Sequence, residues 1–161
     1  AAVDRVDYPY DFDPRTREAH LAAAEASHPA RMNDALKIVT DNNFCIKCHL
    51  LGDFVPTGDI SARAPQLDDV SRRIRPEYAL DWIANPKRIL PYTGMPVNIP
   101  PDKPVSQELF RGDSQQQLNG VVDLLLNFDR FMGSKTSIKP LIKPQAPASH
   151  QSGAQSQDAA Q

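Results

Sequence analysis

The sequence predicts an all-α fold, because several stretches carry helical signals and none shows the alternating pattern of a strand. The chain has 161 residues, a formal net charge of -2 and 15 prolines. This composition fits one globular domain with ends that are not packed. We expect three to four helices, joined by long loops.

The chain begins with an acidic segment, residues 1–29. Asp13 and Pro14 are typical of a helix start, since aspartate caps the N-terminus and proline fits the first turn. The helix would continue from Arg17 to Ala26, but it has few large apolar side chains to anchor it. We therefore interpret residues 1–29 as an N-terminal arm or linker.

Three further helices are expected. The first covers residues 33–40. The second starts at Pro76 and ends before Asn85-Pro86, because the residue before a proline is pushed out of the helical region. The third starts near Ser114, a good N-cap. Their apolar faces hold Ala35, Leu36 and Val39, then Tyr78 and Trp82, then Leu118, Val121, Val122, Leu125 and Phe128, with Asp123, Asn127 and Arg130 on the polar side of the last helix.

These elements divide the chain into three parts. Residues 30–132 contain the three helices and form the expected compact domain. Residues 133–161 are rich in Pro, Gln, Ser and Ala, and they hold too little apolar surface to order themselves. We interpret this last part as a disordered tail.

The only two cysteines of the chain lie in one motif, Cys45-Ile46-Lys47-Cys48-His49. This C-x-x-C-H pattern is the signature by which two thioethers anchor a c-type haem and the adjacent imidazole binds the iron. The motif therefore predicts one haem c, covalently attached through Cys45 and Cys48, with His49 as an iron ligand.

Three alternatives to haem are open at this point. A zinc site would need a second cysteine or histidine pair, and the other histidines are only His20, His28 and His150. A thioredoxin-like pair would lie at a strand-to-helix junction, and no strand pattern surrounds Cys45. The third alternative is an accidental match.

Met95 is the best candidate for the second iron ligand. It lies in a loop that a helix cannot continue through, because Pro91, Gly94 and Pro96 interrupt it. Met132, by contrast, follows Phe131 at a helix end and is expected to fill the core.

The segment 30–132 resembles the class I, mitochondrial-type family of mono-haem cytochromes c. Beside the C-x-x-C-H motif, residues 85–95 are similar to the family segment that ends in the axial methionine, and Ala64-Pro65-Gln66-Leu67 is similar to its Pro-x-Leu segment. The resemblance implies the cytochrome c fold, around one covalently bound haem. It also implies His49 and Met95 as the iron ligands.

The same resemblance implies roles for four other residues. The carbonyl of Pro65 would accept a hydrogen bond from His49, and Leu67 would pack on the haem ring. Trp82 would lie beside the Met95 side of the haem, and Thr93 near a propionate. A carbonyl acceptor of this kind fixes the tautomer of a ligating imidazole.

The chain also departs from the family pattern. Lys37 and Asp41 stand where the family's first helix usually has a glycine and an aromatic residue. Two loops, residues 52–64 and 98–112, are long. We expect these loops to be solvated, with partner recognition as the alternative.

Ligation by His49 and Met95 would leave no open iron position, which predicts electron transfer rather than catalysis. We expect a shuttle or the haem module of a larger respiratory oxidoreductase, with a reductase, oxidase or dehydrogenase as redox partner. Lys87 and Arg88 are candidates for steering that docking. The alternative is a haem sensor or haem enzyme domain with an open or displaceable sixth ligand.

Composition and context limit the location of the chain. No apolar run approaches the roughly 18 residues of a membrane span, so membrane association is expected only through partners or missing segments. The near-neutral charge without a basic face argues against nucleic acid as partner. The covalent haem of the family and a start without methionine predict a periplasmic or otherwise extracytoplasmic protein. Such a protein could also be tethered to a membrane protein.

Overall fold

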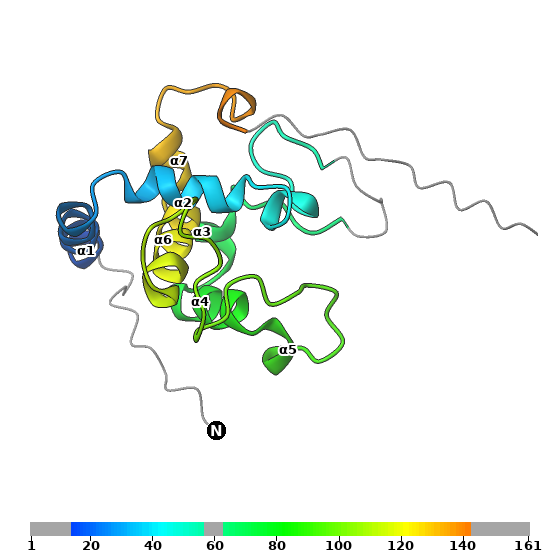
Figure 1. Ribbon diagram of the computed structural model, residues 1–161. Coiled ribbons are helices and arrows are strands. Elements are labelled where there is room, and N and C mark those ends of the chain that lie inside the picture. Colours follow the sequence, from blue (N-terminus) through cyan, green and yellow to red (C-terminus); the bar gives the residue numbers. More distant parts are fainter. Residues whose placement is uncertain (1–13, 57–62, 143–161) are drawn as a thin grey trace, which may run out of the picture.

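A computed structural model describes residues 14–56 and 63–142. Figure 1 shows helices joined by loops, and the described residues hold no β-strand, only isolated bridges. The all-α prediction is confirmed. The elements are α1 (Pro14–Ser27), α2 (Arg31–Val39), the 3-10 turn η1 (Cys45–Lys47), α3 (Val70–Arg73), α4 (Pro76–Ala84), α5 (Pro86–Ile89), α6 (Ser114–Leu126), α7 (Phe128–Met132) and the 3-10 turn η3 (Lys139–Leu141).

Helix α6 is the centre of the core, and α2 and α4 both pack on it. These three helices lie where we predicted them, but the core face of α4 is not the expected pair of Tyr78 and Trp82, since Tyr78 is 45% exposed and Trp82 is only partly buried. Three short helices, α3, α5 and α7, raise the number of helices above the three to four that we expected. The buried apolar side chains of the three main helices are Ala35, Leu36, Ile38, Val39, Ala79, Leu80, Ile83, Ala84, Leu118, Val121, Val122, Leu124, Leu125 and Leu126.

The start of α6 differs by one residue from the expected cap. Asp113, not Ser114, is the N-cap: its Oδ1 accepts from the backbone N–H of Gln116 at 2.8 Å, and Gln116 Oε1 accepts from the N–H of Asp113 at 2.9 Å. This reciprocal pair is a capping box. Ser114 is the first helical residue, and its hydroxyl donates instead to the carbonyl of Pro100.

Asp123 lies in the core, not on a polar face of α6. Its side chain is fully buried, forms an ion pair with Arg31 and lies 3.1 Å from Nε2 of His20. A buried carboxylate requires such partners, because desolvation of an unpaired charge is costly. The expected polar side of α6 is thus covered by the start of α2 and by α1.

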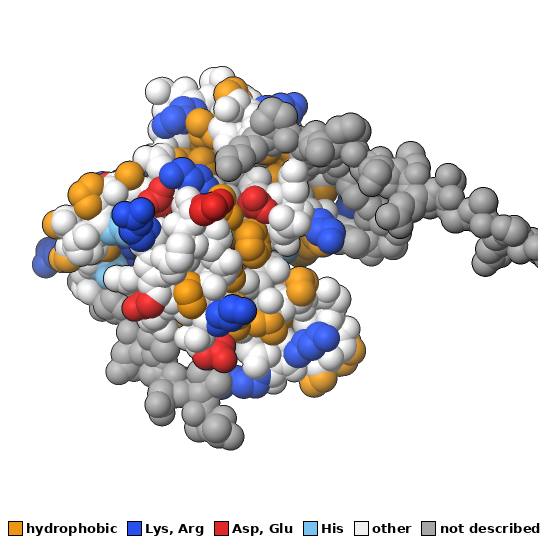
Figure 2. All heavy atoms as spheres, in the orientation of Figure 1, with side chains coloured by type: hydrophobic (Ala, Val, Ile, Leu, Met, Phe, Trp, Pro, Cys, Tyr) orange, Lys and Arg blue, Asp and Glu red, His pale blue; other side chains and the backbone are white. Residues whose placement is uncertain are grey.

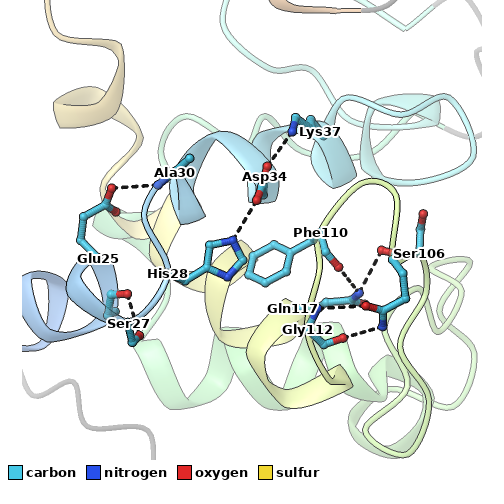
Figure 3. A network of polar contacts seen from close by, with 12 residues as sticks. Glu25, Ser27, His28, Ala30, Asp34, Lys37, Ser106, Phe110, Gly112 and Gln117 are labelled. Carbon is cyan, nitrogen blue, oxygen red and sulfur yellow. Dashed lines mark hydrogen bonds and ion pairs between the residues drawn. The ribbon is translucent and has the colours of Figure 1, made fainter.

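The turn between α1 and α2 is held by a polar network, shown in Figure 3. Nε2 of His28 lies 2.8 Å from Oδ2 of Asp34, and the His28 ring packs against Phe110 with centroids 4.7 Å apart. Burial would raise the pKa of Asp34, but hydrogen bonds from Lys37 and His28 hold it below its ordinary value. Part of the expected arm, α1, therefore contacts the predicted domain, whereas residues 1–13 lie outside the described residues.

The loop 98–112 is exposed in part, as we expected, but two of its residues are packed into the core. Ile99 and Phe110 are almost fully buried. The fully buried Gln117 of α6 holds the loop: its Oε1 accepts from the N–H of Val105 at 2.8 Å, and its Nε2 donates to the carbonyls of Ser106 and Phe110 at 3.0 and 2.8 Å. Because a buried amide requires hydrogen-bond partners, Gln117 fixes the backbone of the loop at Val105, Ser106 and Phe110. Of the other long loop, residues 57–62 lie outside the described residues.

Gly120 of α6 gives the first testable prediction. A Cβ at this position would lie 2.5 Å from Cε2 of the buried Phe110 ring. Gly120→Ala is therefore expected to lower the free energy of unfolding by about 1–3 kcal/mol, despite the better helix propensity of alanine.

Chemical denaturation of the two glycine variants checks this prediction. At Gly94 a Cβ would meet nothing within 4 Å, so Gly94→Ala should change stability by less than about 0.5 kcal/mol. Equal stability of the Gly120 variant and the parent chain would show that Phe110 does not pack on α6 as described.

The chain continues past α7 in an ordered segment, where we expected a disordered tail from Gly133. Gly133 has a φ of 52° and turns the chain out of α7. Ile138 is fully buried, and Figure 1 shows the orange segment with η3 above the cyan loop that follows η1. We name residues 133–142 the C-terminal strap. The strap is held on the domain because the side chain of Ile138 is buried there. Residues 143–161 lie outside the described residues.

Asp53 anchors the strap, which predicts a dependence on pH. Its carboxylate accepts from the N–H of Ile138 at 3.0 Å and from the hydroxyl of Ser137 at 2.8 Å. These hydrogen bonds lower the pKa of Asp53 from its ordinary 3.8. Because the folded pKa is depressed, the stabilisation is present above pH 3.8 and is lost as the pH falls through the folded value.

We expect the backbone amide of Ile138 to lose hydrogen-exchange protection over that acidic range. Asp53→Asn supplies the control, since its side chain does not titrate. An acid transition at Ile138 that is identical in the parent chain and in Asp53→Asn would exclude Asp53 as its cause.

Candidate functional site

The cysteine motif folds as one tight turn, a few residues after the end of α2. The backbone N–H groups of Cys48 and His49 both donate to the carbonyl of Cys45, at 3.2 and 2.9 Å. Ile46 is fully buried, Lys47 is exposed, and both cysteines are partly buried free thiols. The buried Ile46 thus anchors the turn, so that the two thiols and the imidazole come from one ordered segment.

The chain after the motif runs beside residues 64–68. The N–H of Ala64 donates to the carbonyl of Cys48 at 2.8 Å, and the N–H of Leu67 donates to the carbonyl of Leu50 at 3.0 Å. His49 and Ala64 form an isolated parallel bridge. This pairing places Pro65 next to the His49 ring.

Nδ1 of His49 lies 2.7 Å from the carbonyl oxygen of Pro65. A carbonyl can only accept, so Nδ1 carries the proton and the lone pair lies on Nε2. Burial lowers the pKa of His49; the Pro65 hydrogen bond opposes this and the Arg73 charge adds to it. The imidazole is therefore held neutral in the tautomer that a metal ligand needs.

The segment around Pro65 is itself fixed. Leu67 is buried in the core. Arg73 donates to the carbonyl of Gln66 and, at 3.4 Å, to that of Asp69, while Oδ1 of Asp68 accepts from the N–H of Gly52 at 2.6 Å. The roles of Asp68 and Arg73 were not predicted, because hydrogen bonds from side chains to loop backbone follow no fixed sequence spacing.

The burial of Cys45 bears on the thioredoxin-like alternative. Burial raises the pKa of Cys45 to about 12, whereas a thioredoxin-like pair needs a lowered thiol pKa. In residues 14–56 and 63–142, no group of three or more His, Cys, Asp and Glu side chains is placed to hold a metal ion. The raised pKa of Cys45 therefore argues against the thioredoxin-like alternative.

Met95 follows α5 in a loop that is ordered by its own polar groups. The N–H of Thr93 donates to the carbonyl of Leu90 at 3.0 Å, and Oγ1 of Thr93 accepts from the N–H of Met95 at 3.2 Å. Met95 is partly buried against the core, while Tyr92 is 85% exposed. The loop thus turns the thioether toward the protein and Tyr92 toward solvent.

The second group of predicted residues, Trp82 on α4 and Thr93 and Met95 in the loop after α5, is far from the cysteine turn in sequence. Trp82 is partly buried and stacks on Tyr78, with ring centroids 6.0 Å apart. In the view of Figure 1, α5 and its following loop form a lobe of the ribbon. In that view the segment around η1 lies above this lobe.

Comparison of the chain with protein-family models, with curated proteins and with solved structures returned no match. Among the described residues, no helix combines the length and the apolar character that a membrane crossing requires.

Proposed function

We propose that this chain binds one haem c through thioethers to Cys45 and Cys48 and transfers single electrons. The observation that carries the proposal is the hydrogen bond from Nδ1 of His49 to the Pro65 carbonyl, made next to two thiols in a single turn. It leaves Nε2 of His49 as a neutral nitrogen ligand. The resemblance to class I cytochromes c rests in part on the same residues.

The donor set fits haem iron. His49 Nε2 and the Met95 thioether are both neutral, and a thioether favours ferrous iron and a high reduction potential. The haem supplies the one-electron couple of its iron. Pro65 fixes the imidazole, while Leu67 and Trp82 supply apolar surface that excludes water from the group.

The surface near Met95 supports docking of a redox partner. Lys87, Arg88, Tyr92 and Val97 are exposed. Residues 82–101 contain no Asp or Glu, and Asp81 of α4 lies 3.6 Å from Arg88 as its acidic partner. Figure 2 shows basic and apolar side chains on the lobe of α5. A partner with an acidic rim and an apolar centre is complementary to such a surface. We propose an extracytoplasmic reductase, oxidase or dehydrogenase as that partner.

A potentiometric titration of the haem-loaded chain tests this function. The expected result is one reversible one-electron transition, with no consumption of oxygen or peroxide by the reduced chain. Irreversible reduction, or steady turnover of either oxidant, would instead indicate a haem enzyme with an open ligand position.

A further inference from the structure

The C-terminal strap contacts the turn that immediately follows His49. Leu51 and Phe54 exchange backbone hydrogen bonds of 3.3 and 2.9 Å, which makes Gly52 and Asp53 the two central residues of this turn. Gly52 has a φ of +55°, and a Cβ there would lie 3.3 Å from Cγ2 of Ile138. The strap therefore packs directly on the turn.

Polar contacts add to this packing. Asp53 receives the N–H of Ile138 and the hydroxyl of Ser137, and Nζ of Lys139 lies 3.6 Å from its Oδ2. The N–H of the neighbouring Gly52 donates to Asp68. The turn is thus bound to the strap through Asp53 and to residues 64–68 through Gly52.

The same residues 64–68 hold the His49 ring through Pro65. The turn therefore joins two contacts: one to the strap, and one to the segment that orients the imidazole. Only three residues separate His49 from Asp53. A displacement of the turn would therefore also shift the backbone of His49 and with it the imidazole ring.

We propose that the C-terminal strap is a positioning element for the His49 imidazole, with Ile138 and Asp53 as its positioning residues. This inference rests on the proposed function, since it concerns His49 as an iron ligand. Release of the strap is expected to loosen the hydrogen bond between His49 and Pro65 and to change the reduction potential.

The test compares Ile138→Ala with Leu141→Ala in the haem-loaded chain. Both residues are in the strap, but Ile138 is fully buried and Leu141 is exposed. Tryptic cleavage after Lys135 reports release of the strap. Exchange of the His49 Nδ1 proton, followed by NMR in the reduced state, and the midpoint potential report the position of the ring.

Ile138→Ala should accelerate both cleavage after Lys135 and ring-proton exchange by about tenfold or more, and should shift the midpoint potential. Leu141→Ala and the conservative Ile138→Val should stay near the parent chain. Gly120→Ala controls for global destabilisation, because it weakens the core away from the strap and should leave the potential unchanged.

Two results would overturn the inference. One is a strap that trypsin releases as fast in the parent chain as in Ile138→Ala. The other is a released strap with unchanged ring-proton exchange and potential, which would make the strap structural only. Failure of the proposed function is a different observation, since the parent chain would then carry no covalent haem.

Discussion

Replacement of both Cys45 and Cys48 by alanine is expected to abolish covalent attachment of haem. The two thiols of the turn are the only cysteines of the chain, so no other side chain can form the thioethers. The measurement is haem staining on a denaturing gel after expression with a haem-attachment system, together with the intact mass. The expected signal is zero for the double variant.

The single variants and a neighbour supply the controls for this result. Cys45→Ala and Cys48→Ala each keep one thiol and should retain one thioether. Lys47→Ala, which changes the exposed residue between them, should stain like the parent chain. Haem that stays bound to the double variant through denaturation would refute thioether attachment at this turn.

Met95→Ala is expected to leave the haem attached but to remove the second iron ligand. The haem should become high-spin or acquire a different ligand, because alanine has no donor atom. The weak long-wavelength band of iron–methionine ligation should disappear, and the reduction potential should fall, since a thioether favours ferrous iron.

Met132→Ala is the matched control for this variant. Met132 is also a partly buried methionine packed against the core, but it is expected to fill space only. Its replacement should lower stability without changing the absorption spectrum. An unchanged spectrum and potential in Met95→Ala would show that another side chain is the ligand.

The parts of the fold that could be predicted are those with local signals. Helices α2, α4 and α6 are 9, 9 and 13 residues long, long enough for an apolar face to repeat. Helices α3, α5 and α7 have 4, 4 and 5 residues, too few for any period to show. Pro76 marks the start of α4 as predicted, whereas Pro86, which we used only as the end of that helix, is also the first residue of α5.

The parts that could not be predicted depend on distant residues. Asp123 was assigned to a polar face, because nothing near it in sequence reveals that Arg31 and His20 are its partners. Ile138 stands in a Pro- and Lys-containing segment that has the composition of a disordered tail. Only the packing of Ile138 on Gly52 and the carboxylate of Asp53 explain why it is buried.

The candidate site divides in the same way. His49 and Pro65 each belong to a sequence motif of the family, so the resemblance predicts their contact. Nδ1 of His49 lies 2.7 Å from the carbonyl oxygen of Pro65. The iron ligands and the roles of Leu67, Trp82 and Thr93 toward a haem stay predictions. The bonds of Asp68 and Arg73 to backbone groups emerge only when the chain is folded.

The most direct test of a closed His49 and Met95 site is an optical spectrum of the haem-loaded chain, oxidised and reduced, followed by carbon monoxide added to the reduced form. We predict the long-wavelength methionine band in the oxidised state and no response to carbon monoxide. A high-spin spectrum that shifts readily with carbon monoxide would contradict the account, because it would mean an open iron position suited to sensing or oxygen chemistry.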